Sequence, residues 1–343
     1  MRITNSSIMR NYLGNLHSSI NNLSKSNERL SSMRKYSKSS ENTTEASKAF
    51  TVRDQLYKNE QYLSNIEYSI DEFSAAETSL LTINSLLQTV QERSIRANTG
   101  TIDETGRSVI AKEIENIKGQ VLQSINIKFG IRYLFGNSNN EGPPFSVDDE
   151  GMLAYNGIRV ADMVSDSSTG KLMYKNPAYD PTDAASKQYI EVPKNKDVYM
   201  DVGLGIKVVG NEVMPSSAIK ISSSGIEAIG FGENNLYDLL TDIENSLRTG
   251  EMTDIDKKLE ALADHKDNII IHVTDLGSRT SYLEKSKERI ENEVFNLKVK
   301  QRGLEAVDLE YETINNKSLE MAWMINLQLG SQILPASIFD FLR

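Results

Sequence analysis

Residues 255–311 read IDKKLEALADHKDNIIIHVTDLGSRTSYLEKSKERIENEVFNLKVKQRGLEAVDLEY and carry an apolar residue at every seventh position. The members of this series are Ile255, Leu262, Ile269, Leu276, Leu283, Ile290, Leu297, Leu304 and Tyr311. A seven-residue repeat keeps one stripe on one side of an α-helix, as in coiled coils and thin bundles. The sites four residues further on are mixed, since Leu259 and Val273 are apolar whereas Lys266 and Asp308 are not. The stretch therefore predicts a long helix with a narrow apolar stripe.

The predicted helix has no proline to end it early. It is expected to start near Thr253 and to run to about residue 329 unless Gly277 or Gly303 interrupts it. Unbroken, it would be roughly 115 Å long at 1.5 Å per residue.

The first 142 residues are also free of proline and repeat the helical pattern. One run, with spacings of four and three residues, contains Met9, Leu13, Leu16, Ile20, Leu23, Asn27 and Leu30. A second run contains Leu56, Leu63, Ile66, Ile70, Phe73, Leu80 and Leu87, and a third contains Ile110, Ile114, Ile117, Val121 and Ile125. Such spacings predict helices that pack along narrow seams.

The middle of the chain has a different composition. Six of the 7 prolines lie between residues 143 and 215, and twelve of the 20 glycines lie between 130 and 232. Proline and glycine break helices, and short strand-like segments alternate with turns here. The predicted fold is mainly α with an inserted β-rich domain: an elongated antiparallel helical rod with terminal coiled-coil helices. The predicted domains are a coiled-coil helix at 1–40 that pairs with 305–343, the rod at 41–135 and 233–304, and a β-rich outer domain at 136–232.

Composition excludes several classes of function. The chain of 343 residues has a net charge of -10, which argues against a nucleic-acid binder, because phosphate needs a basic face. It has no cysteine, which excludes thiol catalysis and thiolate metal sites. His265 and His272 are about 10 Å apart along a helix, too far for one zinc ion, and are expected to be solvated. No catalytic or nucleotide-binding motif is complete, so we expect no enzyme activity, no cofactor and no metal.

The segment MAWMINLQLGSQILPASIF, residues 321–339, contains no charge, whereas 25% of the chain is charged. Its length approaches that of a membrane span, but Asn326, Gln328 and Pro335 interrupt it and only Arg343 flanks it with positive charge. An ordinary core helix is the second interpretation. The third is a helix that packs against other copies of the chain in a repeating assembly.

The two ends of the chain are complementary in charge. Residues 1–35 contain six basic and one acidic side chain, and residues 305–343 contain six acidic and two basic ones. Pairing the two helices would bury one seam and bring opposite charges together. We expect the N-terminal side chains Met9, Leu13, Leu16, Ile20, Leu23 and Leu30 to face the C-terminal side chains Met321, Trp323, Ile325, Leu329, Ile333 and Leu334. These twelve residues are the predicted polymer interface.

Four segments carry a resemblance to a known family. MRITNSSIMRNYLGNL at the start, ERLSSMRKYSKSSENTTEASKA at 28–49 and IRYLFGNSNNEGPPF at 131–145 resemble the amino-terminal region of bacterial flagellins. AVDLEYETINNKSLEMAWMINLQLGSQILPASIFDFLR at 306–343 resembles the carboxyl terminus of the members that join hook to filament. The chain departs from the family pattern at ENTT (41–44), which replaces Asp-Asp-Pro, and at Met33, where the family prefers glycine.

The resemblance implies a chain that runs out along a helical rod, forms a β-rich outer domain and returns. It implies export through the flagellar type III apparatus and terminal helices that are disordered in the monomer and fold on assembly. The implied function is a structural adaptor between hook and filament of the bacterial flagellum, external or periplasmic. The implied partners are other copies of the chain, a neighbouring hook-associated protein, flagellin and an export chaperone, with no nucleic acid and no membrane. The alternatives are a flagellin paralogue that forms filament and a tail-anchored coiled-coil membrane protein.

Overall fold

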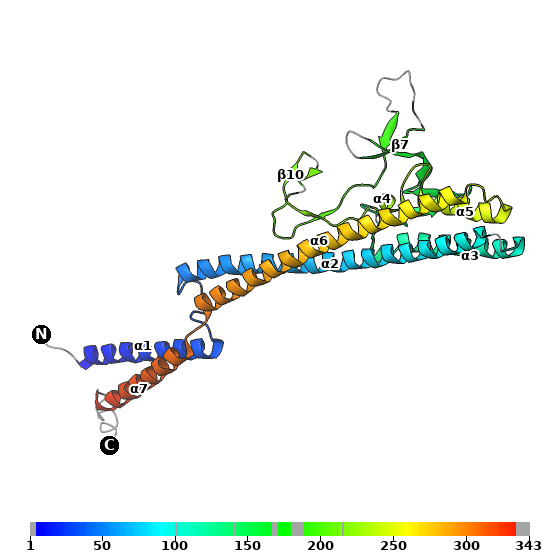
Figure 1. Cartoon of the computed structure of the whole chain (residues 1–343). Coiled ribbons are helices and arrows are strands. Elements are labelled where there is room, and N and C mark those ends of the chain that lie inside the picture. Colours follow the sequence, from blue (N-terminus) through cyan, green and yellow to red (C-terminus); the bar gives the residue numbers. More distant parts are fainter. Residues whose placement is uncertain are drawn as a thin grey trace. The chain divides into compact units, whose positions relative to one another are not determined.

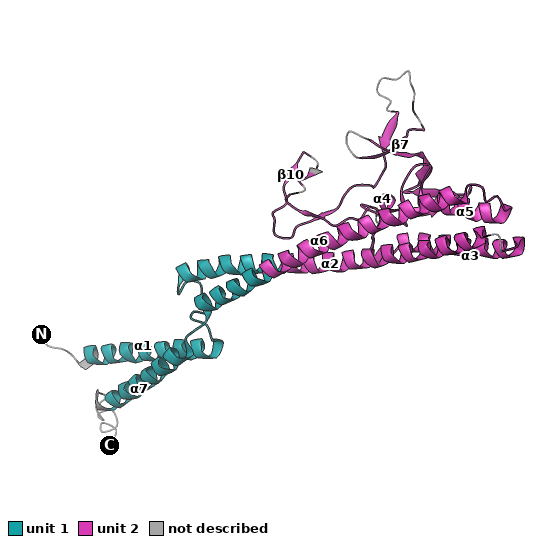
Figure 2. Cartoon of the chain, in the orientation of Figure 1, with its two compact units in different colours: residues 1–60, 291–343 teal, residues 61–290 magenta. Residues whose placement is uncertain are grey.

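The computed structural model describes residues 5–99, 102–139, 141–166, 171–177, 179, 188–210, 212–214 and 216–333. The chain divides into two compact units, residues 1–60 with 291–343 and residues 61–290 (Figure 2). The α-helices of the described residues are α1 (Asn5–Ser32), α2 (Thr43–Asn98), α3 (Glu104–Ile125), α4 (Gly225–Ile229), α5 (Leu236–Thr249), α6 (Ile255–Glu305) and α7 (Leu309–Ile333) (Figure 1). Long helices with a smaller β-rich part confirm the predicted mainly α fold.

The seven-residue series is the buried stripe of α6. Every member from Ile255 to Leu297 is at most 8% exposed. Helix α6 runs antiparallel alongside α2 (Figure 1). An ion pair joins the two helices in each unit. Lys287 pairs with Glu67 (2.8 Å) in the unit of residues 61–290, and Lys298 pairs with Glu60 (3.0 Å) in the other unit.

The predicted continuation of this helix to residue 329 is wrong. Neither Gly277 nor Gly303 interrupts α6; it ends at Glu305, and α7 begins at Leu309. Asp308 starts the new helix, because its carboxylate accepts hydrogen bonds from the backbone N–H groups of Glu310 and Tyr311 (both 3.1 Å). The seven-residue register ends there, and Tyr311 is 70% exposed.

The link between α1 and α2 pairs with the link between α6 and α7 inside the same unit. Lys35 N–H donates to Glu305 O (2.8 Å), and Val307 N–H donates to Met33 O (3.1 Å). Met33 follows the last residue of α1 with φ +56°, the left-handed conformation in which glycine is unstrained.

Helices α3 and α5 lie together in the second unit. Lys118 on α3 pairs with Glu244 on α5 (3.0 Å). Asn235 caps α5 by accepting the N–H of Asp238 (3.0 Å), and Gly250 ends it with φ +79°.

The β-rich part consists of small antiparallel sheets. Their strands are β1 (Lys128–Phe129), β2 (Arg132–Tyr133), β3 (Phe145–Val147), β4 (Leu153–Tyr155), β5 (Ile158–Arg159), β6 (Met163–Ser165), β7 (Leu172–Lys175), β8 (Tyr189–Glu191), β9 (Tyr199–Met200), β10 (Val208–Val209), β11 (Glu212–Val213) and β12 (Ile219–Lys220). A 3-10 turn (Val160–Asp162) joins β5 to β6. The sheet orders are β1-β2, β3-β4-β5, β6-β7-β8, β9-β12 and β10-β11. A core forms where the rings of Phe145 and Tyr155 pack 4.9 Å apart.

Candidate self-association interface

Helices α1 and α7 lie side by side and antiparallel in the first unit (Figure 1). Their contact surface follows the four-three spacing of a coiled coil. The buried or half-buried residues of this seam are Tyr12, Leu16, Ser19, Leu23, Ser26 and Leu30 on α1, and Glu312, Asn316, Leu319, Trp323, Asn326 and Gly330 on α7. Half of the twelve side chains are small or polar, so the seam is a poor hydrophobic core.

The centre of the seam is a hydrogen-bonded network. Ser26 Oγ donates to Glu312 Oε1 (2.6 Å), and Asn316 Nδ2 donates to Ser26 Oγ (3.2 Å). Nearer the chain ends, Asn326 Nδ2 donates to Ser19 Oγ (2.7 Å). The carboxylate of Glu312 is 3.9 Å from Arg29 Nη1. Each neutral hydrogen bond contributes about 1 kcal/mol net, so the network fixes register more than it stabilises the pair.

The far end of the seam is a close approach. Gly330 is buried beneath the ring of Tyr12. Trp323 lies along the seam between the Tyr12–Gly330 contact and the central hydrogen-bonded network, and it is half-buried. Its Nε1 is enclosed and has no hydrogen-bond acceptor among the described residues. The described residues therefore cover the tryptophan only in part.

The predicted facing of the twelve apolar residues is corrected by the structure. Leu16, Leu23, Leu30 and Trp323 do lie in the seam. Met9, Leu13 and Ile20 instead lie beside it, 38–45% exposed. Met321, Ile325 and Leu329 are 56%, 57% and 45% exposed. Ile333 is the last residue of α7, with its side chain outside the described part, and Leu334 lies outside the described residues altogether.

A rotation of α1 explains the correction. Residues 16, 23 and 30 form one row of the seam on α1. The second row could be residues 13, 20 and 27 or, one position earlier, residues 12, 19 and 26. In the structure the second row consists of residues 12, 19 and 26. This choice gives Ser19 and Ser26 partners on α7. The prediction used only the apolar residues and missed the polar residues of the seam. A seven-residue spacing in the sequence could have indicated them, because it separates Ser19 from Ser26 and also relates Glu312, Leu319 and Asn326.

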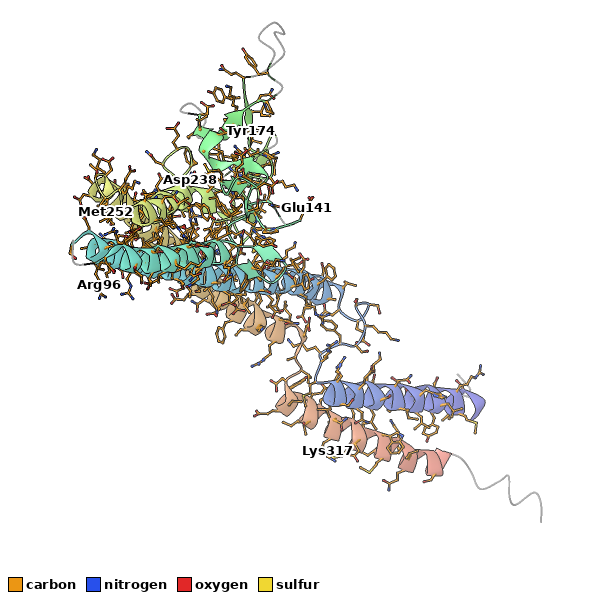
Figure 3. The ribbon with its side chains drawn as sticks, turned by 90° about the vertical axis from the view of Figure 1, so that its right-hand side faces the viewer. Arg96, Glu141, Tyr174, Asp238, Met252 and Lys317 are labelled. Carbon is orange, nitrogen blue, oxygen red and sulfur yellow. The ribbon has the colours of Figure 1, made fainter. Side chains whose placement is uncertain are left out.

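The outward side of α7 is apolar, and the described residues of the unit leave it uncovered. Ile314, Met321 and Ile325 lie roughly half a turn around the helix from the seam, at about 100° per residue, and all three are exposed. Lys317, labelled in Figure 3, is the basic residue among them. Neighbouring apolar side chains on α7 are also exposed, and they are Met324, Leu327 and Leu329. A patch of this kind marks an interaction surface.

The expectation that both histidines are solvated is wrong for His265. Its ring is half-buried against Gly230, and Nε2 lies 2.9 Å from Asn234 O. Burial lowers the pKa of this imidazole, and the hydrogen bond to the Asn234 carbonyl opposes the shift only in part. The described residues contain no group of three or more acidic, histidine or cysteine side chains arranged to hold a metal ion.

The membrane-anchor alternative finds no support in the helices. Among the described residues, which include α7 as far as Ile333, no helix combines the length and the apolarity needed to cross a bilayer.

Comparison with known proteins finds similarity over part of the chain. Residues 3–140 match the bacterial flagellin N-terminal helical region. The chain is 25% identical over 158 residues to flagellar hook-associated protein 3 of Salmonella typhimurium, a match that covers 46% of this chain and 49% of that protein. It is 27% identical over 120 residues to the Escherichia coli protein of the same name, covering 35% and 38%. The chain thus matches half or less of the length of these relatives, and the match confirms the flagellin-like resemblance.

Solved structures share the fold. A putative flagellar hook-associated protein from Vibrio parahaemolyticus superposes with a TM-score of 0.57 at 14% identity, covering 77% of this chain and 99% of that one. FlgL from Bacillus cereus superposes with a TM-score of 0.50 at 19% identity, covering 74% and 99%.

Proposed function

Because residues 3–140 match the bacterial flagellin N-terminal helical region, we propose that this chain is a structural component of the bacterial flagellum. It polymerises as an adaptor between hook and filament, the role that its hook-associated relatives suggest by name. The observation that carries this proposal is the uncovered apolar surface on α1 and α7. A helix pair that serves only its own chain would turn its apolar side chains toward its partner.

The energetics favour assembly over a free monomer. Fully burying a Leu, Ile or Met side chain contributes about 1.5–3 kcal/mol. Roughly half of the surface is exposed to solvent in five apolar residues of the pair: Met9, Leu13 and Ile20 on α1, and Met321 and Ile325 on α7. Covering them in a subunit contact would contribute on the order of 5 kcal/mol before the entropic cost of association. Several such contacts in each subunit make a polymer stable.

The proposal has consequences for partners and location. The terminal segments 1–40 and 305–343 contact other copies of the chain, a neighbouring hook-associated protein and flagellin. The rod segments 41–135 and 233–304 carry the outer domain at 136–232 away from that contact layer. Before assembly, an export chaperone covers the apolar helices, and the chain leaves the cell through the flagellar export apparatus. The role is structural, not catalytic.

A truncation tests the proposal in cells. Deleting residues 321–343 removes the apolar side of α7 and leaves α2, α3, α5 and α6 complete. We expect a folded protein that is absent from the hook-filament boundary, and non-motile cells. The matched control replaces two exposed apolar residues of the other unit, Ile270→Ser and Ile271→Ser, and should swim normally. Normal swimming by the truncated strain would rule the proposal out. Antibody labelling along the whole filament would favour a filament-forming paralogue instead.

A further inference from the structure

We propose that the second unit contains a binding pocket for an alkylammonium or guanidinium group on a short apolar stem. This is the chemistry of a lysine or arginine side chain and of small aliphatic amines. The pocket lies between α6 and the segment 220–228 and has a volume of about 280 Å³. Pockets for drug-sized ligands span roughly 300–1,000 Å³, so this one suits a single side chain or a molecule of similar size. The inference goes beyond the proposed function and does not depend on it.

Two side chains of α6 attach the segment 220–228 to the helix and leave a space between them. Asn268 Nδ2 donates to the backbone carbonyls of Glu227 (2.9 Å) and Ala228 (3.1 Å). About three turns further along α6, Arg279 Nη1 donates to the backbone carbonyl of Ser222 (3.5 Å). The pocket lies along the stretch of α6 that these two attachments enclose.

The pocket combines an apolar wall with a polar rim. His272 and Asp275 line it from α6, where they lie between the two attachment points and on the same side of the helix. Its apolar lining includes side chains that are at most 3% exposed, and these are Leu80, Phe135, Ala228 and Leu276. A stem of a few methylene groups can therefore pack on this wall while its polar end stays at the rim.

The charges at the rim favour a cation. Lys220 pairs with Asp197 (2.8 Å), and Arg279 pairs with Asp275 on its own helix. Glu227 lines the pocket from α4 and is exposed. Among the described residues its carboxylate has no ion pair and no hydrogen bond. One negative charge is therefore left over at the rim, and a cationic ligand would compensate it.

An enclosed hydroxyl adds a second polar group for the ligand. Ser224 lines the pocket, and its Oγ is buried with no hydrogen-bond partner among the residues that the structure describes. Buried hydroxyls are usually hydrogen-bonded, so an unpartnered one at a pocket is available to a ligand. An ammonium group has three N–H donors and a guanidinium group has five. Either has enough donors for both this hydroxyl and the Glu227 carboxylate.

Histidine NMR of the full-length chain reads the pocket directly. The chain has 3 histidines, and His272 lines the pocket, so its ring signal, assigned with His272→Gln, reports binding there. The probes are n-butylammonium and n-butyrate, which share an apolar stem and carry opposite charges, at equal ionic strength. We expect butylammonium to shift this signal saturably, with a dissociation constant on the order of a few millimolar for so small a ligand, and to leave His17 unchanged. Butyrate should bind at least about fivefold more weakly, and equal or tighter binding of butyrate would overturn the inference.

Removing the leftover charge tests its role. Glu227→Gln should weaken butylammonium binding by about threefold, because an exposed ion pair contributes modestly. The matched control is Glu260→Gln, which changes an exposed carboxylate of α6 outside the pocket and should leave the affinity unchanged. Both side chains are exposed, so both variants should fold. Unaltered affinity of Glu227→Gln would overturn the assignment of the site to a cation.

A third probe distinguishes the two sources of such a ligand. Nα-acetyl-lysine methylamide carries an alkylammonium group on a peptide backbone. Binding at least as tight as that of butylammonium would support a lysine of another polypeptide as the occupant, and binding of butylammonium alone would support a free amine. If neither ammonium probe shifts the His272 signal, the inference is overturned while the proposed function stands.

Discussion

The hydroxyl of Tyr12 on α1 lies directly over Gly330 on α7, so that a β-carbon built at Gly330 would stand 2.0 Å from it. Real β-carbons do not approach another heavy atom so closely. The seam between the terminal helices therefore depends on a glycine in the last turns of α7, where glycine is intrinsically unfavourable by about 1 kcal/mol relative to alanine. The close approach of the two helices is the reason to place it there.

Replacing Gly330 by alanine should open this end of the seam. The new methyl group displaces the Tyr12 ring, and the lost packing outweighs the gain in helix propensity. Hydrogen exchange of α1 and α7 in the monomer should become faster. Gly14→Ala is the matched control, because no atom lies within 4 Å of a β-carbon at Gly14, and it should slow exchange in α1. Equal slowing by both substitutions would contradict the close approach.

Making the seam apolar should strengthen the pairing within the monomer. Ser26 and Glu312 are both nearly fully buried and bonded to each other. Replacing a buried bonded pair by apolar groups of similar shape is often neutral or stabilising. The double variant Ser26→Ala with Glu312→Leu should therefore slow hydrogen exchange in both helices, whereas Ser26→Ala alone should accelerate it by removing the hydroxyl that donates to the buried carboxylate. A double variant that exchanges faster than the single one would show that the polar network stabilises the pair.

Met33 provides a test of backbone strain. A non-glycine residue with φ near +56° costs about 1–2 kcal/mol. Glycine relieves that cost but loses about 0.4–1 kcal/mol through greater freedom of the unfolded chain. Met33→Gly should thus raise the free energy of unfolding by up to about 1 kcal/mol in urea titration. Ser24→Gly, an exposed position in the middle of α1, is the control and should lower it by roughly 0.5 kcal/mol.

His265 makes stability depend on pH. Burial lowers its pKa in the folded protein, so the folded state favours the neutral ring. The stabilising contribution is present above the unfolded pKa of about 6.5 and is lost as pH falls below it through the folded pKa. Thermal unfolding of the unmodified chain should therefore lose more stability between pH 7.5 and 5.5 than that of His265→Gln. Parallel losses in the two proteins would show that this histidine titrates as it does in the unfolded chain.

The sequence predicts most of the helical architecture because its signals are local and repeated. The stripe from Ile255 to Leu297 predicts α6, and the run from Ile110 to Ile125 predicts α3. The break between α6 and α7 escaped prediction because neither proline nor glycine stands at 306–308. It depends on backbone pairing with residues near Met33, far away in the sequence.

The predicted orientation of the N-terminal helix differs from that in the structure. The apolar residues of both ends were recognisable, but two registers share Leu16, Leu23 and Leu30. Choosing between the registers requires knowing that Ser19 and Ser26 have hydrogen-bond partners on α7. That information lies in the pairing of the two helices and not in either helix alone. The consequence is large, because it moves Met9, Leu13 and Ile20 from a seam to an exposed surface.

The central claim, that other copies of the chain cover the outward side of α7, is tested most directly by thiol accessibility at position 321. The chain lacks cysteine, so Met321→Cys reports one site, and Ser278→Cys on the exposed side of α6 reports a reference. Maleimide labelling rates are measured in the monomer and in the assembled protein. We predict that position 321 reacts readily in the monomer and is protected at least tenfold relative to the reference after assembly. Equal reactivity of position 321 in the two states would contradict the account.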